Sequence, residues 1–196
     1  MILSPIALHE LPAILTAFAR GLDGEVAASA AFGRIAATLR FAPELKADLH
    51  AGRSKAIGLA QRLGIGTIDE EPAAAFSWDG HAIRTRSETS VVFHEIAHWQ
   101  IAPIHRRGIY DFGLGAGPET GRVDAANAVA CVDNATKEDE ENLASLLGIL
   151  WETQHDEPAI LAFAEQNWLE LPDRPHTARH FATYFNRLAQ RGLVPR

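Results

Sequence analysis

The sequence predicts a helix-rich α+β fold. Apolar residues recur at spacings of three and four along most of the 196 residues, as they do in amphipathic helices. Only two short segments are extended in character, Ala74–Trp78 and Ala82–Thr85, and the Asp79-Gly80 pair between them is typical of a hairpin turn. The hydrophobic content of 47% suffices for one core, and no repeat or linker divides the chain. We therefore expect a single domain over residues 1–196.

Helices are expected at both ends of the chain and between the central motifs. Glycines interrupt the apolar periodicity and mark where one helix stops and the next begins. We divide the chain into a helical N-terminal part over residues 1–66, a core over 74–153 and C-terminal helices over 154–196. Outside the two main helices of the core, helices are expected over 6–20, 24–40, 44–63, 122–132, 157–168 and 175–192.

The core is expected to pass from the hairpin directly into a helix that begins near residue 86. Thr85 and Glu88 have the spacing of a capping box, which starts helices. Pro103 ends the helix, because it lacks an N–H group and disfavours helical geometry at the residue before it. A second strong helix runs from Glu138 to Glu152, and its acidic first turn suits the helix dipole.

The first of these helices contains the most informative string of the chain, His94-Glu95-Ile96-Ala97-His98. Two histidines four residues apart project from one face of a helix, so both imidazoles can bind one metal ion. Glu95 points at the same cavity, where it can take a proton from a water molecule on the metal. The alternative is a pair of core histidines on an ordinary amphipathic helix, which leaves Glu95 without a role.

A catalytic metal is usually held by three protein ligands beside an open position. A third histidine in the extended motif is excluded, because its position holds Ile104 and His105 lies one residue out of register. A glutamate on a downstream helix is the other arrangement, and we predict Glu141. Glu140 is the rival third ligand, because it lies nearer the stripe of leucines on the same helix. The remaining alternative is that both glutamates are solvated and bind no metal. Three small residues on the Glu141 face would let a second helix approach closely: Ala144, Ser145 and Gly148.

Two histidines and one carboxylate suit two metals. They match a gluzincin-type zinc site, in which Glu95 would deprotonate water and return the proton to a leaving amine. They also match the facial triad of non-haem iron(II) oxygenases, where Glu95 would shuttle a proton or contact the substrate. The prediction is one divalent metal ion, Fe(II) or Zn, bound by His94, His98 and Glu141, with Glu95 as the catalytic residue.

The residues after the helix that carries His94 and His98, called the metal helix below, offer further polar groups. Asp111 is expected to orient a ligand histidine. Arg106 and Arg107 would bind a carboxylate, pair with the acidic start of the downstream helix, or lie on the surface. Tyr110 would donate a hydrogen bond to a developing oxyanion or pack in the core.

The composition limits which binding partners and which cellular compartment we expect for this protein. The net charge of −7 and the absence of a basic run argue against nucleic acid or an anionic membrane surface as a main partner. The single cysteine, Cys131, cannot form an internal disulfide, and its apolar neighbours predict burial, which fits a reducing cytoplasm. The start of the chain lacks the pattern of a signal peptide, and no stretch is long enough to span a membrane.

Residues 94–113 resemble a known family. His94-Glu95-Ile96-x-His98-Trp99-x-Ile101-Ala102, then Arg106-Arg107 and Asp111-Phe112-Gly113, is similar in order and spacing to the central segment of the elongation factor P hydroxylases. The aromatic and cysteine-containing stretch that follows in that family is absent here. The resemblance implies metal-dependent, oxygen-using hydroxylation of a modified lysine on a translation factor.

A looser likeness runs through Phe76-Ser77-Trp78, the metal helix and Glu140-Glu141-x-x-Ala144. This combination resembles the metallopeptidase-like domain of plasmid antirestriction proteins. Both likenesses imply a zincin-like core, which is a small twisted sheet, an active-site helix and a second helix that carries the glutamate.

Three functions follow from these patterns. The first is iron-dependent hydroxylation of a protein side chain, with a protein or peptide substrate such as a translation factor. The second is a zinc metallopeptidase of gluzincin type. The third is a non-enzymatic binding module stabilised by a metal, for which an intact Glu95 has no use. No pattern in the sequence predicts the oligomeric state.

Overall fold

The computed structural model describes residues 9–41, 50, 52–169 and 176–195. Contacts within the chain divide it into two compact units. The first unit combines Met1–Ala47 with Ile149–Arg196, and the second is Asp48–Gly148. The described residues are mostly helical and include one two-stranded sheet, which confirms the helix-rich α+β class.

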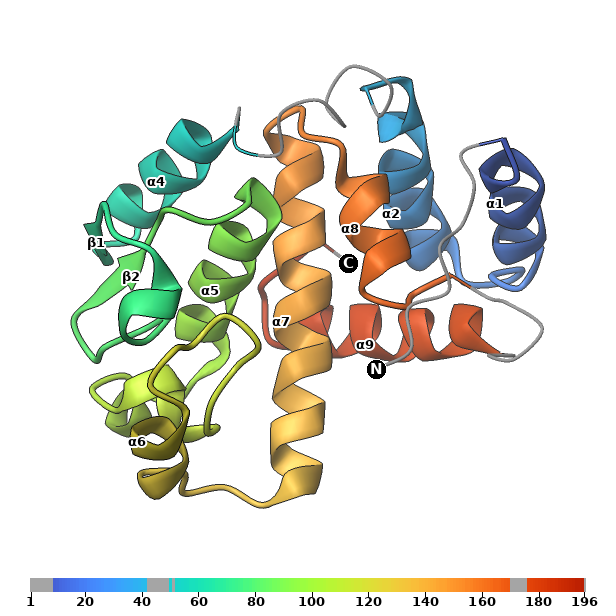
Figure 1. The fold of residues 1–196 in the computed structure, drawn as a ribbon. Helices are drawn as coiled ribbons and strands as arrows, with labels where there is room; N and C mark the ends of the chain where they lie inside the picture. Colours follow the sequence, from blue (N-terminus) through green and yellow to red (C-terminus); the bar gives the residue numbers. More distant parts are fainter. Residues whose placement is uncertain (1–8, 42–49, 51, 170–175, 196) are drawn as a thin grey trace. The chain divides into compact units, whose positions relative to one another are not determined.

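The first unit is built from helices of both chain ends. Its elements are α1 (Leu11–Arg20), α2 (Val26–Ala37), the 3-10 helix η1 (Thr38–Phe41), α8 (Ala159–Glu165) and α9 (Thr177–Gln190) (Figure 1). One buried phenylalanine from each α-helix meets the others, with ring centroids 4.5 to 6.3 Å apart: Phe18, Phe32, Phe163 and Phe181. Such aromatic clusters bury large apolar areas in favourable edge and tilted geometries. The periodicity therefore placed these four helices correctly, although residues 6–8 and 175 lie outside the described residues.

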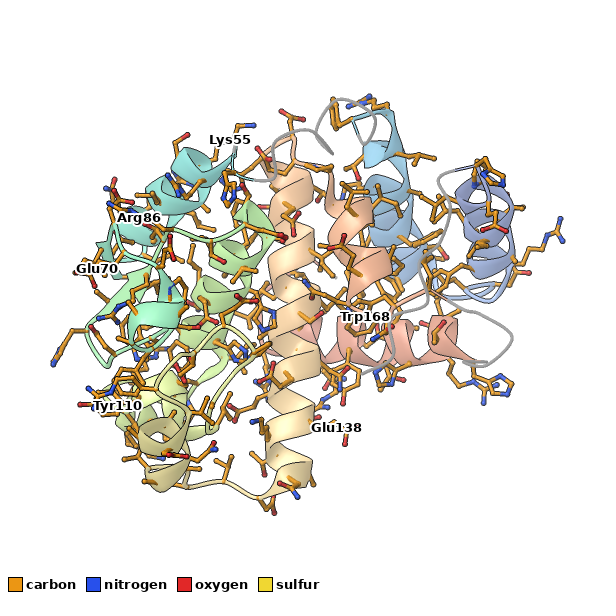
Figure 2. The ribbon with its side chains drawn as sticks, viewed as in Figure 1. Lys55, Glu70, Arg86, Tyr110, Glu138 and Trp168 are labelled. Atoms are coloured by element: carbon orange, nitrogen blue, oxygen red, sulfur yellow. The ribbon has the colours of Figure 1, made fainter. Side chains whose placement is uncertain are left out.

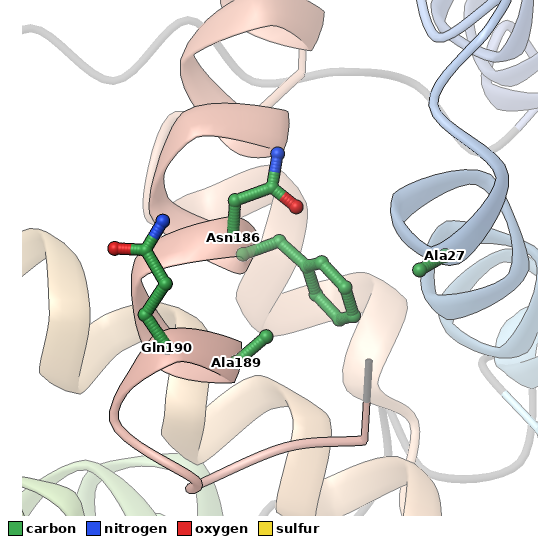
Figure 3. Close-up of a pocket in the computed structure, with 5 residues that line it drawn as sticks. Ala27, Asn186, Ala189 and Gln190 are labelled. Atoms are coloured by element: carbon green, nitrogen blue, oxygen red, sulfur yellow. The ribbon is translucent and has the colours of Figure 1, made fainter.

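A pocket of about 400 Å³ lies between α2 and α9 of this unit (Figure 3). Its lining is apolar apart from two amide side chains: Ala27, Phe185, Asn186, Ala189 and Gln190. No titratable group lines it, so it offers nothing for acid–base or metal chemistry.

Glu152 is a buried carboxylic acid in the first unit. Its side chain is only 3% exposed, and its Oε1 atom has no hydrogen-bond partner within the described residues. Burial raises the pKa of Glu152 well above the ordinary value, and the charges of Glu157 and Glu165 raise it further. The native state therefore holds Glu152 protonated at pH values where the unfolded chain ionises it.

Replacing Glu152 by glutamine is expected to stabilise the protein at neutral and alkaline pH. A pKa raised by folding contributes stability below the unfolded pKa, and this contribution is lost as pH rises towards the folded pKa. The Glu152→Gln variant lacks this loss, so its free energy of unfolding relative to that of the wild type should be greater at pH 8 than at pH 4. Urea unfolding at pH 4 and pH 8 measures it. The exposed Glu25→Gln change in the same unit is the control, and an equal gain at both pH values would contradict the prediction.

The second unit contains the sheet and the helix with the two histidines (Figure 1). Its α-helices and strands are α4 (Arg53–Arg62), β1 (Gly66–Ile68), β2 (Ala82–Arg84), α5 (Thr89–Ile101), α6 (Val123–Ala128) and α7 (Asn134–Gln154) as far as Gly148. Three short 3-10 helices connect them: η2 (Pro72–Ala74), η3 (Ile104–Arg106) and η4 (Tyr110–Gly113). Helix α4 packs on β1 and α5, and α5 also contacts β2.

The predicted hairpin is confirmed only in part, because its two flanks pair through one bridge and the sheet itself was not predicted. Strand β2 lies where the second hairpin strand was expected, but it pairs in parallel with β1, in the register Gly66 to Ala82 and Ile68 to Arg84. The segment before Asp79 contributes only an isolated antiparallel bridge between Trp78 and Ile83. The glycine of β1 resembled a helix terminator in the sequence. In the fold it is needed because a Cβ at Gly66 would collide with the His81 carbonyl.

The predicted capping box is wrong, whereas the predicted end of α5 is confirmed. Glu88, not Thr85, precedes the first helical residue, and no side chain caps the helix start. The Thr85 hydroxyl and N–H both donate to the Ile68 carbonyl, so Thr85 prolongs the pairing of the strands. At the other end, Ala102 has extended backbone angles before Pro103, and α5 stops at Ile101.

Helices α6 and α7 differ in length from the prediction. Helix α6 is shorter than the expected 122–132, and Cys131 beyond it is exposed rather than buried. Helix α7 starts at Asn134, before the expected Glu138, because the Asp133 carboxylate accepts the Thr136 N–H at 2.7 Å. Among the residues that the structure describes, no helix combines the length and apolar character needed to cross a membrane.

Helix α7 approaches the backbone of α5 at Gly148. A Cβ atom added there would lie 3.2 Å from both the N and the Cα of His94. The small-residue face of α7 therefore does allow the close approach that the sequence predicted, and it brings α7 against the first of the two histidines.

Replacing Gly148 by alanine is expected to destabilise the protein by about 1–3 kcal/mol, because the added methyl group overpacks the contact between α7 and α5. Gly58 is the matched control in helix α4, where the nearest atom to an added Cβ is 3.6 Å away on the Arg62 side chain. Gly58→Ala should stabilise by roughly 0.5–1 kcal/mol through helix propensity. Chemical denaturation measures both, and a stabilised Gly148→Ala variant would show that the two helices have room to separate.

Candidate metal centre

Two helices of the second unit bring three potential metal ligands together. The Nε2 atoms of His94 and His98 on α5 are 2.9 Å apart, and the Glu141 Oε2 on α7 lies 3.3 Å from each. Ligand atoms that share one metal ion at bond lengths near 2.1 Å are roughly 3–3.5 Å from one another. Within the described parts of the chain, this is the one group of three or more such side chains that meets at ligand spacing.

The three side chains differ in their access to solvent. His98 is 6% exposed, His94 is 22% exposed and Glu141 is 38% exposed. The histidine near the end of α5 thus anchors the group in the interior, while the other two side chains are partly exposed to solvent. A site of this kind leaves room for a water molecule or a substrate group beside the three protein ligands.

The charges within the group favour a cation. Burial works against the ionised Glu141 carboxylate, but the His98 charge and hydrogen bonds from both imidazoles hold its pKa far below the usual range. Burial also opposes protonation of His98, yet Glu141 raises the pKa of that imidazole. The pKa of His94 is lowered by burial and by His98. A carboxylate beside one proton-binding and one neutral imidazole is a set that a divalent ion can occupy by displacing a proton.

Glu95, the residue between the histidines, is held in its protonated form near neutral pH. Burial raises the pKa of its carboxyl to about 8, and the negative charges of Asp111, Glu141 and Glu119 add to this, while His98 opposes it. A carboxyl group with a pKa close to the operating pH is suited to accept and return a proton.

The loop of η4 packs on the ligand His98. The Phe112 ring stacks on the His98 imidazole at 5.6 Å and on the Trp78 ring at 5.3 Å. Asp111, Phe112 and Gly113 all have positive φ angles, of 43°, 57° and 71°. Consecutive left-handed residues that include a phenylalanine are strained, and such strain persists only where the surroundings hold it, often at functional sites.

Asp111 anchors this strained loop. Its carboxylate accepts hydrogen bonds from the Trp78 N–H at 3.2 Å and from the Thr120 hydroxyl at 2.7 Å. Burial raises the pKa of Asp111, and these hydrogen bonds partly offset the effect. The predicted contact with a ligand histidine is therefore replaced by an indirect one, in which Asp111 holds the loop and Phe112 contacts His98.

The two arginines and the tyrosine have separate environments. Arg106 is buried and its guanidinium pairs with Glu140 at the start of α7, which was one of the predicted alternatives. Glu140 therefore faces Arg106, and it is Glu141 that meets the histidines. The Arg107 guanidinium lies over the Trp99 ring at 3.8 Å. Tyr110, labelled in Figure 2, is 39% exposed and stacks on Phe76 with ring centroids 4.0 Å apart.

The sequence did not predict that the rings of Trp78 and Phe112 stack beside His98, or that Asp111 holds their loop through Thr120. Trp78 and Thr120 are distant in sequence from the histidines, and no spacing relates them to the metal helix. The available signals were the Asp111-Phe112-Gly113 string in the segment that resembles the hydroxylases and the Phe76-Ser77-Trp78 string in the looser likeness. The sequence did supply His94, Glu95, His98 and Glu141, and the structure brings the three predicted ligands to one point.

Comparison with known proteins gives no match, whether to a protein-family model, to a curated protein or to a solved structure. The likenesses to the elongation factor P hydroxylases and to the antirestriction domain therefore stay predictions, and so does the zincin-like core.

Proposed function

We propose that the protein is an enzyme that depends on one divalent metal ion bound by His94, His98 and Glu141. The observation that carries the proposal is the convergence of two imidazole nitrogens and one carboxylate oxygen within 3.3 Å, with His94 and Glu141 partly exposed to solvent. A purely structural site would be expected to be closed by a fourth protein ligand, and no fourth candidate joins this group among the described residues.

We also propose a zincin-like arrangement for the second unit. It has an active-site helix, α5, and a second helix, α7, which supplies the glutamate and packs closely on the first at Gly148. The sheet that accompanies these helices has two parallel strands within the described residues. The proposal therefore rests on the two helices and their ligands.

The first reaction that we propose is oxygen-dependent hydroxylation of a protein side chain, with iron(II) as the metal and an external two-electron reductant, so that one oxygen atom of dioxygen enters a C–H bond and the other leaves as water. Iron(II) held by two histidines and a carboxylate supplies the capacity to bind and activate dioxygen. Support comes from the residues of the hydroxylase-like segment, since Arg106 and Phe112 are folded against the ligand helices rather than spread over the surface. Glu95 would move a proton at the substrate, and a protein such as a translation factor would be the substrate.

A zinc peptidase is the second candidate, and the Glu95 carboxyl favours it. With a pKa of about 8, the ionised fraction of this group can take a proton from an attacking water molecule, and the protonated form can return it to a leaving amine. Zinc would supply Lewis acidity to the carbonyl and to the water. The hydroxylase and the peptidase use the same ligands and differ in the metal and in the co-substrate.

Metal content tests the proposal. The wild type, His94→Ala and Glu141→Ala would be purified without a tag under anaerobic conditions and measured by elemental mass spectrometry. Near-stoichiometric iron in the wild type alone would support the hydroxylase, and oxygen uptake with a mass gain of one oxygen on a partner protein would follow. Zinc with the same dependence on both residues would support the peptidase. A wild type without metal after reconstitution would overturn the proposal and favour a non-enzymatic binding module.

A further inference from the structure

Arg106 connects three parts of the second unit. It lies in η3, just after the helix that carries both histidines, and it is only 5% exposed. Its Nη2 donates to the Oε1 of Glu140 on α7, and its Nη1 donates to the Phe112 carbonyl at 3.2 Å. One buried guanidinium therefore links the segment after α5, the start of α7 and the strained loop of η4.

The contact with Glu140 sets the rotation of α7. Successive side chains of an α-helix point about 100° apart around the axis. When Glu140 is fixed towards Arg106, the next side chain, Glu141, is turned towards His94 and His98. The Glu141 carboxylate then reaches both imidazoles at 3.3 Å.

The contact with Phe112 acts on the other side of the site. The Phe112 carbonyl belongs to a residue with a φ of 57°, which needs external support. The ring of the same residue stacks on the His98 imidazole. By holding the Phe112 backbone, Arg106 also holds the ring that fixes the orientation of a ligand histidine.

We propose that Arg106, together with Glu140, is a positioning residue that holds Glu141 and His98 in metal-binding geometry. This inference rests on the proposed metal site and adds a role for two residues that do not themselves touch the metal. Buried ion pairs contribute little net stability, since the removal of two charges from water costs about as much as their attraction returns. The effect of this pair is therefore expected in the geometry of the ligands more than in the stability of the fold.

Cobalt(II) titration tests the inference, because cobalt reports both affinity and ligand geometry through its visible absorption. Arg106→Lys keeps the charge but lacks the planar fork whose two arms serve Glu140 and Phe112, and Glu140→Gln keeps the shape but loses the charge. Each is expected to weaken cobalt binding about 10–100-fold and to change the visible spectrum, as the loss of outer partners of metal ligands does. The matched controls are Arg86→Lys, at an exposed ion pair with Asp69, and Glu138→Gln, at an exposed position of α7 (Figure 2). Both controls should bind cobalt like the wild type.

A double variant separates positioning from folding. Arg106→Met combined with Glu140→Met leaves no unpaired buried charge, so its unfolding by urea should match or exceed that of the wild type. Its cobalt affinity is still expected to fall about 10–100-fold. A double variant with wild-type affinity and spectrum would overturn the inference while the metal site stands. A wild type that binds no cobalt would overturn the metal site itself and this inference with it.

Discussion

Replacement of Glu141 by glutamine is expected to lower the affinity for the metal by more than about 100-fold, which exceeds the effect of losing an outer partner of a ligand. Glutamine has the shape of glutamate but lacks its charge, so two histidines would be left to hold the ion. Among the described residues, the Glu141 Oε2 is the one anionic atom that lies 3.3 Å from both imidazoles. Isothermal titration of metal-free protein with zinc or anaerobic iron(II) measures the change.

Glu138→Gln is the control for this substitution, because it makes the same chemical change at an exposed position one turn earlier on α7 (Figure 2). It should bind the metal like the wild type. If Glu141→Gln bound metal as tightly as the wild type while His94→Ala did not, the third ligand would have to be another residue. Glu140 would then be the first candidate, despite its pairing with Arg106.

The Glu95→Gln substitution is expected to lower turnover by about 10²–10⁴-fold while the metal content stays at the wild-type level. Turnover should fall because Glu95 carries a proton that can be transferred near the ligands. The metal content should not change because Glu95 is not one of the three residues whose ligand atoms converge. Oxygen uptake by iron-loaded protein and peptide cleavage by zinc-loaded protein measure turnover. A variant that lost its metal would show that Glu95 has a structural part in the site, and unchanged turnover would exclude its catalytic role.

The same substitution has a signature in the metal-free protein that needs no substrate. Folding raises the pKa of Glu95 from 4.5 to about 8, so its contribution to stability is complete below pH 4.5 and is lost as pH rises to 8. Over this interval the wild type should lose roughly 2–4 kcal/mol of unfolding free energy relative to Glu95→Gln. Denaturation of both proteins with a chelator at pH 4.5, 6.5 and 8.5 tests this. If the unfolding free energies of the two proteins changed in parallel with pH, the Glu95 carboxyl would be solvated.

Local patterns in the sequence were sufficient for the parts of the site that lie on one helix. His94 and His98 share a face because of helical periodicity, and Pro103 ends α5 because of its own backbone chemistry. The small face of α7 at Gly148 also predicted a close helix contact correctly. Each of these inferences depends on residues within a few positions of one another.

Pairing between distant segments was not predictable in this way. The Asp79-Gly80 turn predicted that its two flanks would pair, and they do so only through the bridge between Trp78 and Ile83, while β2 takes β1 as its parallel partner. Thr85 had the spacing of a helix cap and instead bonds to the Ile68 carbonyl. In both cases the structure contains a hydrogen-bonded pairing with the distant β1 segment that no local signal indicated.

The sequence by itself determined the helix-rich class and the ligand types, because helical periodicity and side-chain chemistry are properties of short segments. Only the tertiary structure decided which glutamate meets the histidines. Glu140 and Glu141 are adjacent on one helix, and their roles depend on how that helix is rotated. The buried Arg106 takes Glu140 and turns Glu141 to the imidazoles. The strained loop that lays Phe112 on His98 is likewise held by Trp78 and Thr120, which are remote in the sequence and meet Asp111 only in the folded chain.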